Sequence, residues 1–364
     1  MRIGDLCTYA PKSQIKAGEA VDGAEYMFFT SSADESKRYS DYQFDGEGII
    51  MGTGGNATLH YYSGKYATST DCVVLLPNEQ VRCKYLYYFF KANMKVLEAG
   101  FKGAGLKHTN KKYIDNICIE HIPNYGIQDK VIRIFDEVQS VIDSRKEELL
   151  LLDDLIRARF VELFENGDYK TEKLGSVCTK ITDGTHKTPT YLDEGITFIS
   201  AKNIVNGELD FSDVKHISEE EYQEIQKRCQ TAIYDILLSK SGSLGAPVIV
   251  KTEEKLGLFE SLAVIKYDRE KLLPEFLCEQ LKTDRIQRQF TTGTKGVAIK
   301  HLHLGVIAET DVIVPPIEEQ RQFADFVKQV NKSKFQKYNA TILSHNIYVF
   351  ETRRRFICKP TLII

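Results

Sequence analysis

The chain has 364 residues, of which 42% are hydrophobic and 27% are charged, and its formal net charge is −3 at pH 7. This length suits two globular domains, each able to bury its own core. No segment supplies the roughly 20 apolar residues of a membrane span, and the first residues show no leader pattern, so we expect a cytoplasmic protein. The eight cysteines are scattered singly, which favours reduced, packed thiols over a zinc site or a disulfide framework.

The first half of the sequence returns, with changes, in the second half. The offset between the copies starts near 170 and grows to 192 through insertions in the second copy. Such duplication predicts a pseudo-twofold molecule that engages a target with two similar halves. The matching segments are 2–7 with 173–178, 26–31 with 196–201, 49–54 with 237–242, 105–108 with 298–301, and Ile122-Pro123 and Gln128 with Val314-Pro315 and Gln320.

Each copy combines short strands with one buried helix. The runs 72–76 and 262–265 are rich in β-branched and leucine residues, and the apolar runs 85–91 and 274–281 are typical of a helix. The pattern predicts an α/β (α+β) fold. We divide the chain into a first globule (1–125), a first spacer helix (126–168), a second globule (169–314), a second spacer helix (315–357) and a tail (358–364).

The segment between the globules predicts a long helix with one apolar stripe. Its 4-3 spacing, broken only at Arg145 and Arg159, corresponds to a coiled-coil seam of about 50 Å. Asn166, Gly167 and Asp168 then end the helix. The predicted seam residues are Val131, Phe135, Val138, Ile142, Leu149, Leu152, Ile156 and Leu163.

A second helix follows the second globule and is expected to begin at Pro315, with Phe323, Val327 and Val330 on its stripe. We expect the two helices to pair as an antiparallel coiled coil. The alternative is that each helix packs only on its own globule. Beyond Val330 the stripe carries Lys334 and Lys337, for which the sequence alone offers no explanation.

The distribution of charge matters more than the net value. Residues 128–168 contain eleven acidic and six basic residues, so the rest of the chain carries close to +2. Basic residues gather at corresponding places in both copies, where a polyanion such as DNA can dock. These clusters are Lys102, Lys107, His108, Lys111 and Lys112 in the first copy, and Arg285, Arg288, Lys295, Lys300, His301 and His303 in the second.

Motifs for catalysis are absent. The sequence contains neither of the glycine-rich phosphate-binding patterns, and Pro315-Pro316 is followed by Ile317, so it lacks the quartet that an amino-methyltransferase uses to hold a flipped base. His301 and His303 are a weak candidate for zinc. We therefore predict a binding protein with no catalytic residue, metal or cofactor of its own.

Exposed loops are the candidate recognition elements. The run Thr182-Asp183-Gly184-Thr185-His186-Lys187 combines hydroxyl groups with positive charge, which suits phosphate oxygens, although a simple solvated turn is an equal alternative. Asn203, if exposed, has an amide able to read an adenine edge. The candidate DNA-binding residues are Lys102, Lys107, His108, Asn110, Lys111, Lys112, Thr182, Thr185, His186, Lys187, Lys202, Asn203, Lys240, Ser243, Thr294, Lys295, Lys300 and His301.

Five segments of the second copy carry a recognisable pattern, at 174–175, 183–186, 198–204, 235–245 and 314–320. Together these segments resemble the specificity subunit of type I restriction-modification systems, and the resemblance covers almost the whole chain. The first copy has a less clear version, with residues 9–14 in place of the Asp-Gly-Thr-His loop.

The resemblance implies two target-recognition domains, each reading half of a bipartite site in double-stranded DNA, held apart by the paired helices. It also implies partners: two methyltransferase subunits that use S-adenosylmethionine, and restriction (translocase-nuclease) subunits that use ATP and Mg²⁺. It implies no membrane partner. Two alternatives stay open, a coiled-coil scaffold that joins proteins, and a silent or recombining copy of a specificity subunit.

Overall fold

The computed structural model describes residues 1–364 apart from 104–106, 166, 293–300 and 357–364, and for 338–356 it describes the helix but not the side chains. The chain forms two compact units. Unit 1 comprises Met1–Lys146 and Tyr338–Ile364, and unit 2 comprises Glu147–Lys337. Each unit thus joins one α/β globule to part of each of two long helices. Among the described helices none has the length and apolar character to cross a membrane.

Unit 1 is built on a six-stranded sheet with the order β1-β6-β4-β5-β2-β3. All neighbours are antiparallel except β2 and β5, which run parallel. Helix α2 buries Leu86, Phe89 and Phe90 in the same core as Ile49 and Leu75 of the sheet. The elements are α1 (Ile3–Leu6), β1 (Cys7–Tyr9), η1 (Ala17–Glu19), β2 (Tyr26–Phe29), β3 (Arg38–Tyr39), β4 (Phe44–Gly52), β5 (Leu59–Thr68), β6 (Cys72–Pro77), α2 (Cys83–Ala92), α3 (Met94–Glu98), α4 (Lys111–Asp115) and the first part of α5 (Tyr125–Phe160).

Unit 2 repeats this topology with the sheet split in two. The order β14-β13-β16-β8 corresponds to β5-β4-β6-β1, and β15 pairs parallel with β9 as β5 does with β2. The duplication and the mixed α/β fold are therefore confirmed. After α5 come η2 (Val161–Glu165), β7 (Thr171–Lys173), η3 (Leu174–Ser176), β8 (Cys178–Asp183), β9 (Ile196–Ile199), η4 (Ala201–Asn203), β10 (Ile204–Val205), β11 (Glu208–Leu209), β12 (Lys215–Ile217), α6 (Glu219–Arg228), β13 (Ile236–Ser239), β14 (Pro247–Ile249), β15 (Leu256–Leu258), β16 (Leu262–Tyr267), α7 (Pro274–Lys282), α8 (Asp284–Thr292), α9 (Leu304–Ala308), β17 (Asp311–Ile313) and α10 (Ile317–Phe356).

Strand register corrects the alignment of the two copies by one residue. Gly52 pairs with Cys72 on β6, and Ser239 pairs with Leu262 on the equivalent strand β16. The sequence comparison matches Gly52 with Lys240, whereas the structure matches it with Ser239. The residue equivalent to Lys240 is therefore Thr53.

A buried glutamine at the start of each long helix is a second shared feature. Gln128 donates to the carbonyl oxygen of Pro123 (2.8 Å) and accepts from the backbone N–H of Arg82 (2.7 Å). Gln320 does the same with Pro315 (2.8 Å) and Leu273 (2.9 Å). Both glutamines are fully buried, so each fixes its helix to the segment before the buried helix of its own copy.

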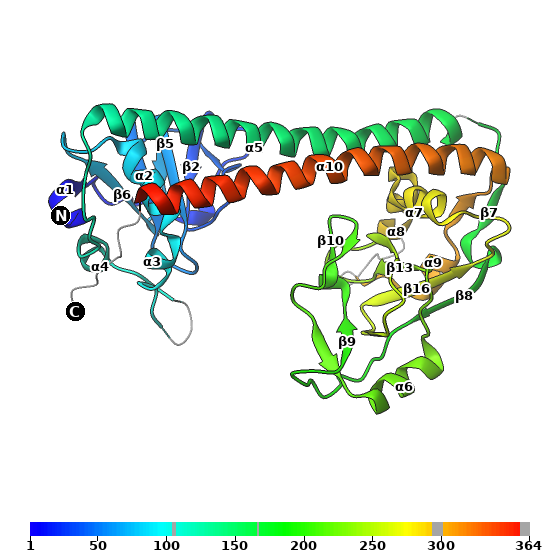
Figure 1. The fold of residues 1–364 in the computed structure, drawn as a ribbon. Coiled ribbons are helices and arrows are strands. Elements are labelled where there is room, and N and C mark those ends of the chain that lie inside the picture. The colour runs from blue at the N-terminus through cyan, green and yellow to red at the C-terminus, as the bar shows by residue number, and fades with distance from the viewer. Residues whose placement is uncertain (104–106, 166, 293–300, 357–364) are drawn as a thin grey trace. The chain divides into compact units, whose positions relative to one another are not determined.

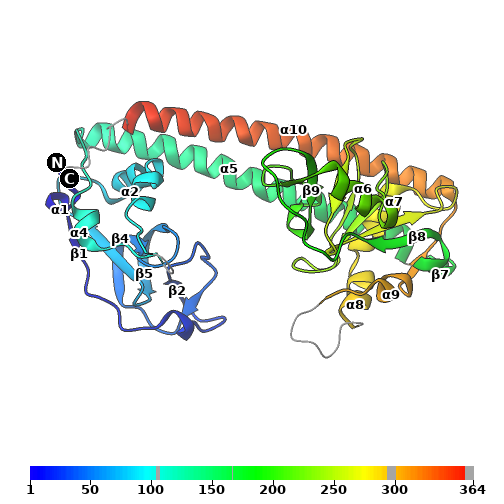
Figure 2. The ribbon, with the colours of Figure 1, turned by 90° about the horizontal axis from the view of Figure 1, so that it is seen from below.

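The long helices pair antiparallel within unit 2. Phe160 of α5 stacks edge-on against Phe323 of α10, with 5.5 Å between ring centres. Further along α10, Lys334 binds Asp153 (2.6 Å), a residue earlier in α5. Residue numbers rise along one helix as they fall along the other, so the predicted antiparallel pairing is confirmed there. Figures 1 and 2 both show α5 and α10 side by side.

The polar residues on the α10 stripe have a structural role that the sequence did not reveal. Lys334 and Lys337 form ion pairs with Asp153 and Glu148 across the helix pair, at 2.6 and 2.5 Å. These ion pairs replace apolar contacts at two positions of the seam, which accounts for the charged residues at Lys334 and Lys337.

The predicted seam residues serve two purposes. In unit 1, Val131 and Phe135 pack into the globule core beneath α2, so this part of α5 also packs on its own globule. In unit 2, Ile156 joins the α10 residues in one core that also contains Phe276 of α7. The buried seam residues are Val131, Phe135, Ile142, Ile156, Phe323, Val327 and Val330, and Val138, Leu149, Leu152 and Leu163 are half-buried.

Candidate nucleic-acid interface

The Asp183–His186 loop leaves the end of β8 along a path that requires glycine. Thr185 donates its backbone N–H to the carbonyl of Leu258 (2.9 Å) and accepts from the N–H of Glu260 (3.0 Å). A Cβ atom on Gly184 would lie 2.1 Å from the same Leu258 oxygen. Because no side chain fits there, glycine lets the two backbones approach. Backbone hydrogen bonds therefore hold the loop against the segment 258–260, so the loop is more than a simple solvated turn.

A buried ion pair lies directly behind this loop. Lys240 Nζ donates to Asp183 Oδ2 at 2.5 Å, and both side chains are only 3% exposed. Lys240 also donates to the carbonyl of Glu260 (3.0 Å). Burial by itself would raise the pKa of Asp183, but the hydrogen bond and charge of Lys240, with Arg228 and His186 nearby, lower it overall. Asp183 is therefore a carboxylate at neutral pH, because the opposite charges around it favour the ionised form more than burial disfavours it.

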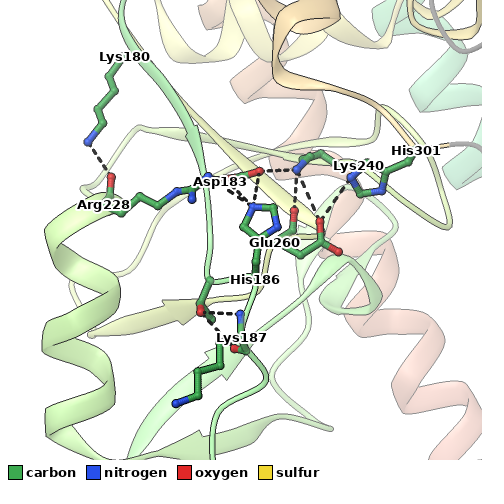
Figure 3. Close-up of polar contacts among 9 residues, drawn as sticks. Lys180, Asp183, His186, Lys187, Arg228, Lys240, Glu260 and His301 are labelled. Atoms are coloured by element: carbon green, nitrogen blue, oxygen red, sulfur yellow. Dashed lines mark hydrogen bonds and ion pairs between the residues drawn. The ribbon is translucent and has the colours of Figure 1, made fainter.

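The same carboxylate positions two exposed cationic or polar side chains (Figure 3). Arg228, at the end of α6, binds Asp183 Oδ1, and His186 Nε2 lies 3.3 Å from Oδ2. Their side chains are 54% and 57% exposed. Lys180 holds the other side of Arg228 by donating to its carbonyl oxygen (2.7 Å). Asp183 thus links a buried lysine to a surface guanidinium and imidazole.

A hollow of about 390 Å³ opens beside this group. Its walls are formed by the Gly184–Lys187 segment, Pro189, and Glu221, Glu224, Ile225 and Arg228 of α6. The wall therefore has a basic side, with His186, Lys187 and Arg228, and an acidic side on the helix. Such a mixture can bind a phosphate at one side and accept hydrogen bonds from a base at the other.

His301 closes the far side of the network. Its Nε2 lies 3.4 Å from Glu260 Oε2, and the N–H of Leu302 donates to the carbonyl of Lys240 (2.9 Å). The rings of His301 and His303 are 5.7 Å apart. The described residues contain no group of three or more histidine, cysteine, aspartate or glutamate side chains placed to hold a metal.

In unit 1 the two described ends of the basic segment meet beside the turn that follows β4. Lys102 and His108 exchange backbone hydrogen bonds at 3.0 Å, and Gly55 donates to the carbonyl of Lys107 (2.9 Å). Lys111 lies over the ring of Tyr9, 4.4 Å from its centre. Lys102, Lys107, His108, Lys111 and Lys112 are all exposed. Asn110 is exposed too, but its side-chain oxygen caps α4 by accepting from Tyr113 N (2.9 Å).

Three predicted contact residues are buried instead. Asn203 is 3% exposed, and its amide donates to the carbonyls of Asp210 and Asp213, both at 3.1 Å. Its suggested reading of an adenine edge is wrong, because the amide is already satisfied inside the fold. Lys240 is 3% exposed and forms an ion pair with Asp183. Thr182 is 7% exposed. The side chains of all three residues are therefore enclosed by the fold, unlike those of the exposed candidates.

The remaining candidate DNA-binding residues differ in how exposed their side chains are and in whether they already have a partner. Lys187 and Ser243 are exposed and Thr185 is half-buried, while Lys202 is exposed but paired with Asp213 (2.9 Å). Thr294, Lys295 and Lys300 lie outside the described residues. Sequence analysis missed Arg228, which reaches Asp183 from 45 residues away. No local signal marks it, because an arginine at the end of a charged helix is ordinary.

The two units have the same strand topology, and each carries basic loops at the same edge of its sheet, which defines a duplicated recognition protein. The chain belongs to the family of the type I restriction modification DNA specificity domain, whose sequence profile matches residues 1–152 and again 166–343. Specificity subunits of type I systems are non-catalytic, and the catalytic activities reside in other subunits. This agrees with the prediction of a subunit without catalytic residues.

Named relatives are distant but extend over most of the chain. The type I restriction enzyme MjaVIII specificity subunit of Methanocaldococcus jannaschii is 19% identical over 306 residues, covering 78% of this chain and 72% of its own. The EcoBI specificity subunit of Escherichia coli is 22% identical over 319 residues, covering 78% and 66%. The crystal structure of an S subunit from M. genitalium has a TM-score of 0.52 at 15% identity and covers 98% of this chain and 96% of its own, which shows a shared fold.

Proposed function

We propose that this chain reads a bipartite site in duplex DNA, one half with each unit, and directs methyltransferase and restriction subunits to it. The observation that carries the proposal is that both units expose basic side chains at the same edge of their equivalent sheets. In unit 1 these side chains are Lys102, Lys107, His108 and Lys111, near the end of β4, and in unit 2 they are His186, Lys187 and Arg228, near the end of β8. Because the proposed target is DNA inside the cell, we also propose that the protein works in the cytoplasm.

Two kinds of contact are expected at each half-site. Lysine and arginine side chains neutralise phosphates and fix the register of a unit on the duplex, while groups that reach base edges provide the specificity. Arg228 suits either role, because its guanidinium keeps an exposed edge while Asp183 holds the other. The Glu221 and Glu224 side of the hollow can accept from a cytosine amino group.

We infer that the helix pair sets the separation of the half-sites. At 1.5 Å per residue, α5 with 36 residues and α10 with 40 residues are about 54 and 60 Å long. Two heads that bind the same face of B-DNA need half-sites separated by about one helical turn or a multiple of it. The ion pairs of Lys334 and Lys337 fix the relative position of the two helices along their axes.

We also propose that partner subunits dock on the outer face of α5. Leu150, Leu151 and Leu155 are 66%, 59% and 47% exposed, although leucine is normally buried. Neighbouring apolar side chains on a helix suit a helical protein partner better than they suit DNA. In this proposal the methyltransferase subunits, two per chain, bind S-adenosylmethionine, and the restriction subunits bind ATP and Mg²⁺, so this chain contributes no cofactor site.

The test compares methylated adenines in the DNA of cells with and without this chain, in the presence of the methyltransferase subunit. We expect a two-part motif with a fixed gap, present only with the chain. Purified chain and methyltransferase should then bind a duplex containing that motif more tightly than a scrambled duplex of the same length. If the two proteins associate but the motif is absent and both duplexes bind equally, the chain acts as a scaffold and the proposal fails.

A further inference from the structure

The two units differ at one equivalent place in the sheet. Thr53 donates its N–H to the carbonyl of Asp71 (2.8 Å) and accepts from the N–H of Thr109 (3.0 Å). Lys240 makes the same two backbone contacts with Ser261 (2.7 Å) and Leu302 (2.9 Å). Thr53 therefore occupies the place that the buried lysine has in unit 2.

The partner of that lysine is replaced as well. Asp183 faces Ala263 across the β8–β16 pair. In unit 1, Tyr9 faces Leu75, so continuing the register brings Pro11 opposite Val73, the equivalent of Ala263. Proline and threonine cannot form an ion pair. Unit 1 therefore lacks the buried ion pair that Lys240 and Asp183 form in unit 2.

Unit 1 has a pocket of about 200 Å³ at this place. Two lysines, Lys12 and Lys111, and four threonines contribute to its lining, and no acidic residue does. Among the described residues, Lys12 and Lys111 have no carboxylate within ion-pairing distance, and Lys111 contacts the ring of Tyr9. The hydroxyl of Thr109, which also lines the pocket, is buried without a hydrogen-bond partner in the described part of the chain.

This combination favours an anion. Two ammonium groups at one hollow attract negative charge more strongly than isolated surface lysines do, because the walls exclude part of the screening water. Threonine hydroxyls can donate to oxygen atoms of the ligand. In unit 2 the equivalent place holds Lys240, whose positive charge is neutralised by Asp183, so this place offers no free charge to an anion.

We propose that this pocket of unit 1 binds one backbone phosphate of the DNA half-site that unit 1 reads. The proposal rests on the proposed function and adds to it that the two units grip DNA differently. Unit 1 takes a phosphate into a pocket between strand ends, through Lys12 and Lys111. Unit 2 has the same place closed by its own ion pair and presents Arg228 at the surface instead.

The experiment uses the full chain with its methyltransferase partner and a duplex carrying the methylated motif. Single phosphates of both half-sites are replaced, one at a time, by uncharged methylphosphonates, and the dissociation constant is measured for each duplex. The variant K12Q/K111Q is compared with wild type. The matched control is K95Q/K130Q, which removes two exposed lysines of unit 1 outside the pocket. Circular dichroism melting of each variant verifies folding.

For wild type we expect one phosphate in one half-site whose neutralisation weakens binding about tenfold or more, as for a charge-assisted hydrogen bond. K12Q/K111Q should bind the unmodified duplex correspondingly weakly and should be insensitive to neutralisation of that phosphate. Its plot of log affinity against log salt concentration should be shallower by about one unit. K95Q/K130Q should keep the wild-type pattern.

Two results would overturn the inference. One is a K12Q/K111Q variant that binds like the control. The other is a variant that binds weakly but keeps the full wild-type sensitivity at every phosphate, since the lysines would then act elsewhere. Failure of the proposed function looks different: wild type itself would show no preference for the motif over a scrambled duplex.

Discussion

Replacing Lys240 by methionine should open unit 2 locally, because it leaves Asp183 buried without its main partner. Removal of one member of a buried ion pair costs about 3–5 kcal/mol. Asp183 keeps contacts to Arg228 and His186, whose side chains are about half exposed, so the lower end of that range applies. We therefore expect K240M to lower the free energy of opening by about 3 kcal/mol.

Amide hydrogen exchange measured by mass spectrometry suits this test, because the chain contains no tryptophan and consists of two compact units whose stabilities must be followed separately. Peptides covering β8 and β13 should exchange about 100-fold faster in K240M, since each 1.4 kcal/mol is a factor of ten. Peptides of unit 1 should not change. The control K251Q breaks an exposed pair with Glu208, whose side chains are more than half exposed, and should change exchange little.

The pH dependence gives an independent check. The pKa of Asp183 in the folded chain is below its unfolded value, so its ionisation stabilises unit 2 above the unfolded pKa, and that contribution is lost as pH falls through the folded pKa. D183N should lack this acid-side loss. Exchange rates of β8 and β13 in K240M within threefold of wild type would refute the reasoning, because the buried charge would then need no partner.

Three further predictions concern the helices and the thiols. Adding one heptad between Leu149 and Leu163, with a matching heptad in α10, should lengthen the gap of the methylated motif and leave both half-sequences unchanged; altered half-sequences at a constant gap would contradict the helix spacer. Replacing Lys334 by glutamate should lower the free energy of unfolding by no more than about 1 kcal/mol, because the pair is part-exposed, and this loss should be seen as a lower melting temperature. Adding D153K should restore the melting temperature, and no restoration would exclude a direct pairing. Burial raises the pKa of Cys83 and Cys278 to about 12, so both thiols should react far more slowly with a disulfide reagent in the folded chain than in guanidinium, as followed by absorbance.

The features that the sequence predicted are those with a local or repeated signature. Helix α5 was found from its 4-3 spacing, and the duplication was found from paired segments such as those around Gln128 and Gln320. A helix stripe records which face is buried, and a repeat records that two segments fold alike. Neither requires knowledge of the partner residue.

The site was predicted less well because its residues meet across long separations. Asn203 and Lys240 are polar types that are usually exposed, but in this fold each is surrounded and satisfied by other segments. Arg228 joins Asp183 only through the packing of α6. The pocket of unit 1 depends on Thr53, the equivalent of Lys240, and a one-residue shift between the copies hides that equivalence in the sequence comparison.

The glutamines that secure the two long helices have a consequence for exchange between relatives. The side-chain hydrogen bonds of Gln128 are made to residues 80–123 of the first copy, and those of Gln320 to residues 271–315 of the second. A crossover that falls beyond such a glutamine, and in α5 also beyond Val131 and Phe135, transfers the complete joint with its globule. A chimaera cut between the globule and that glutamine must instead match two foreign surfaces, so cuts within the helices are the safer design for combining recognition units.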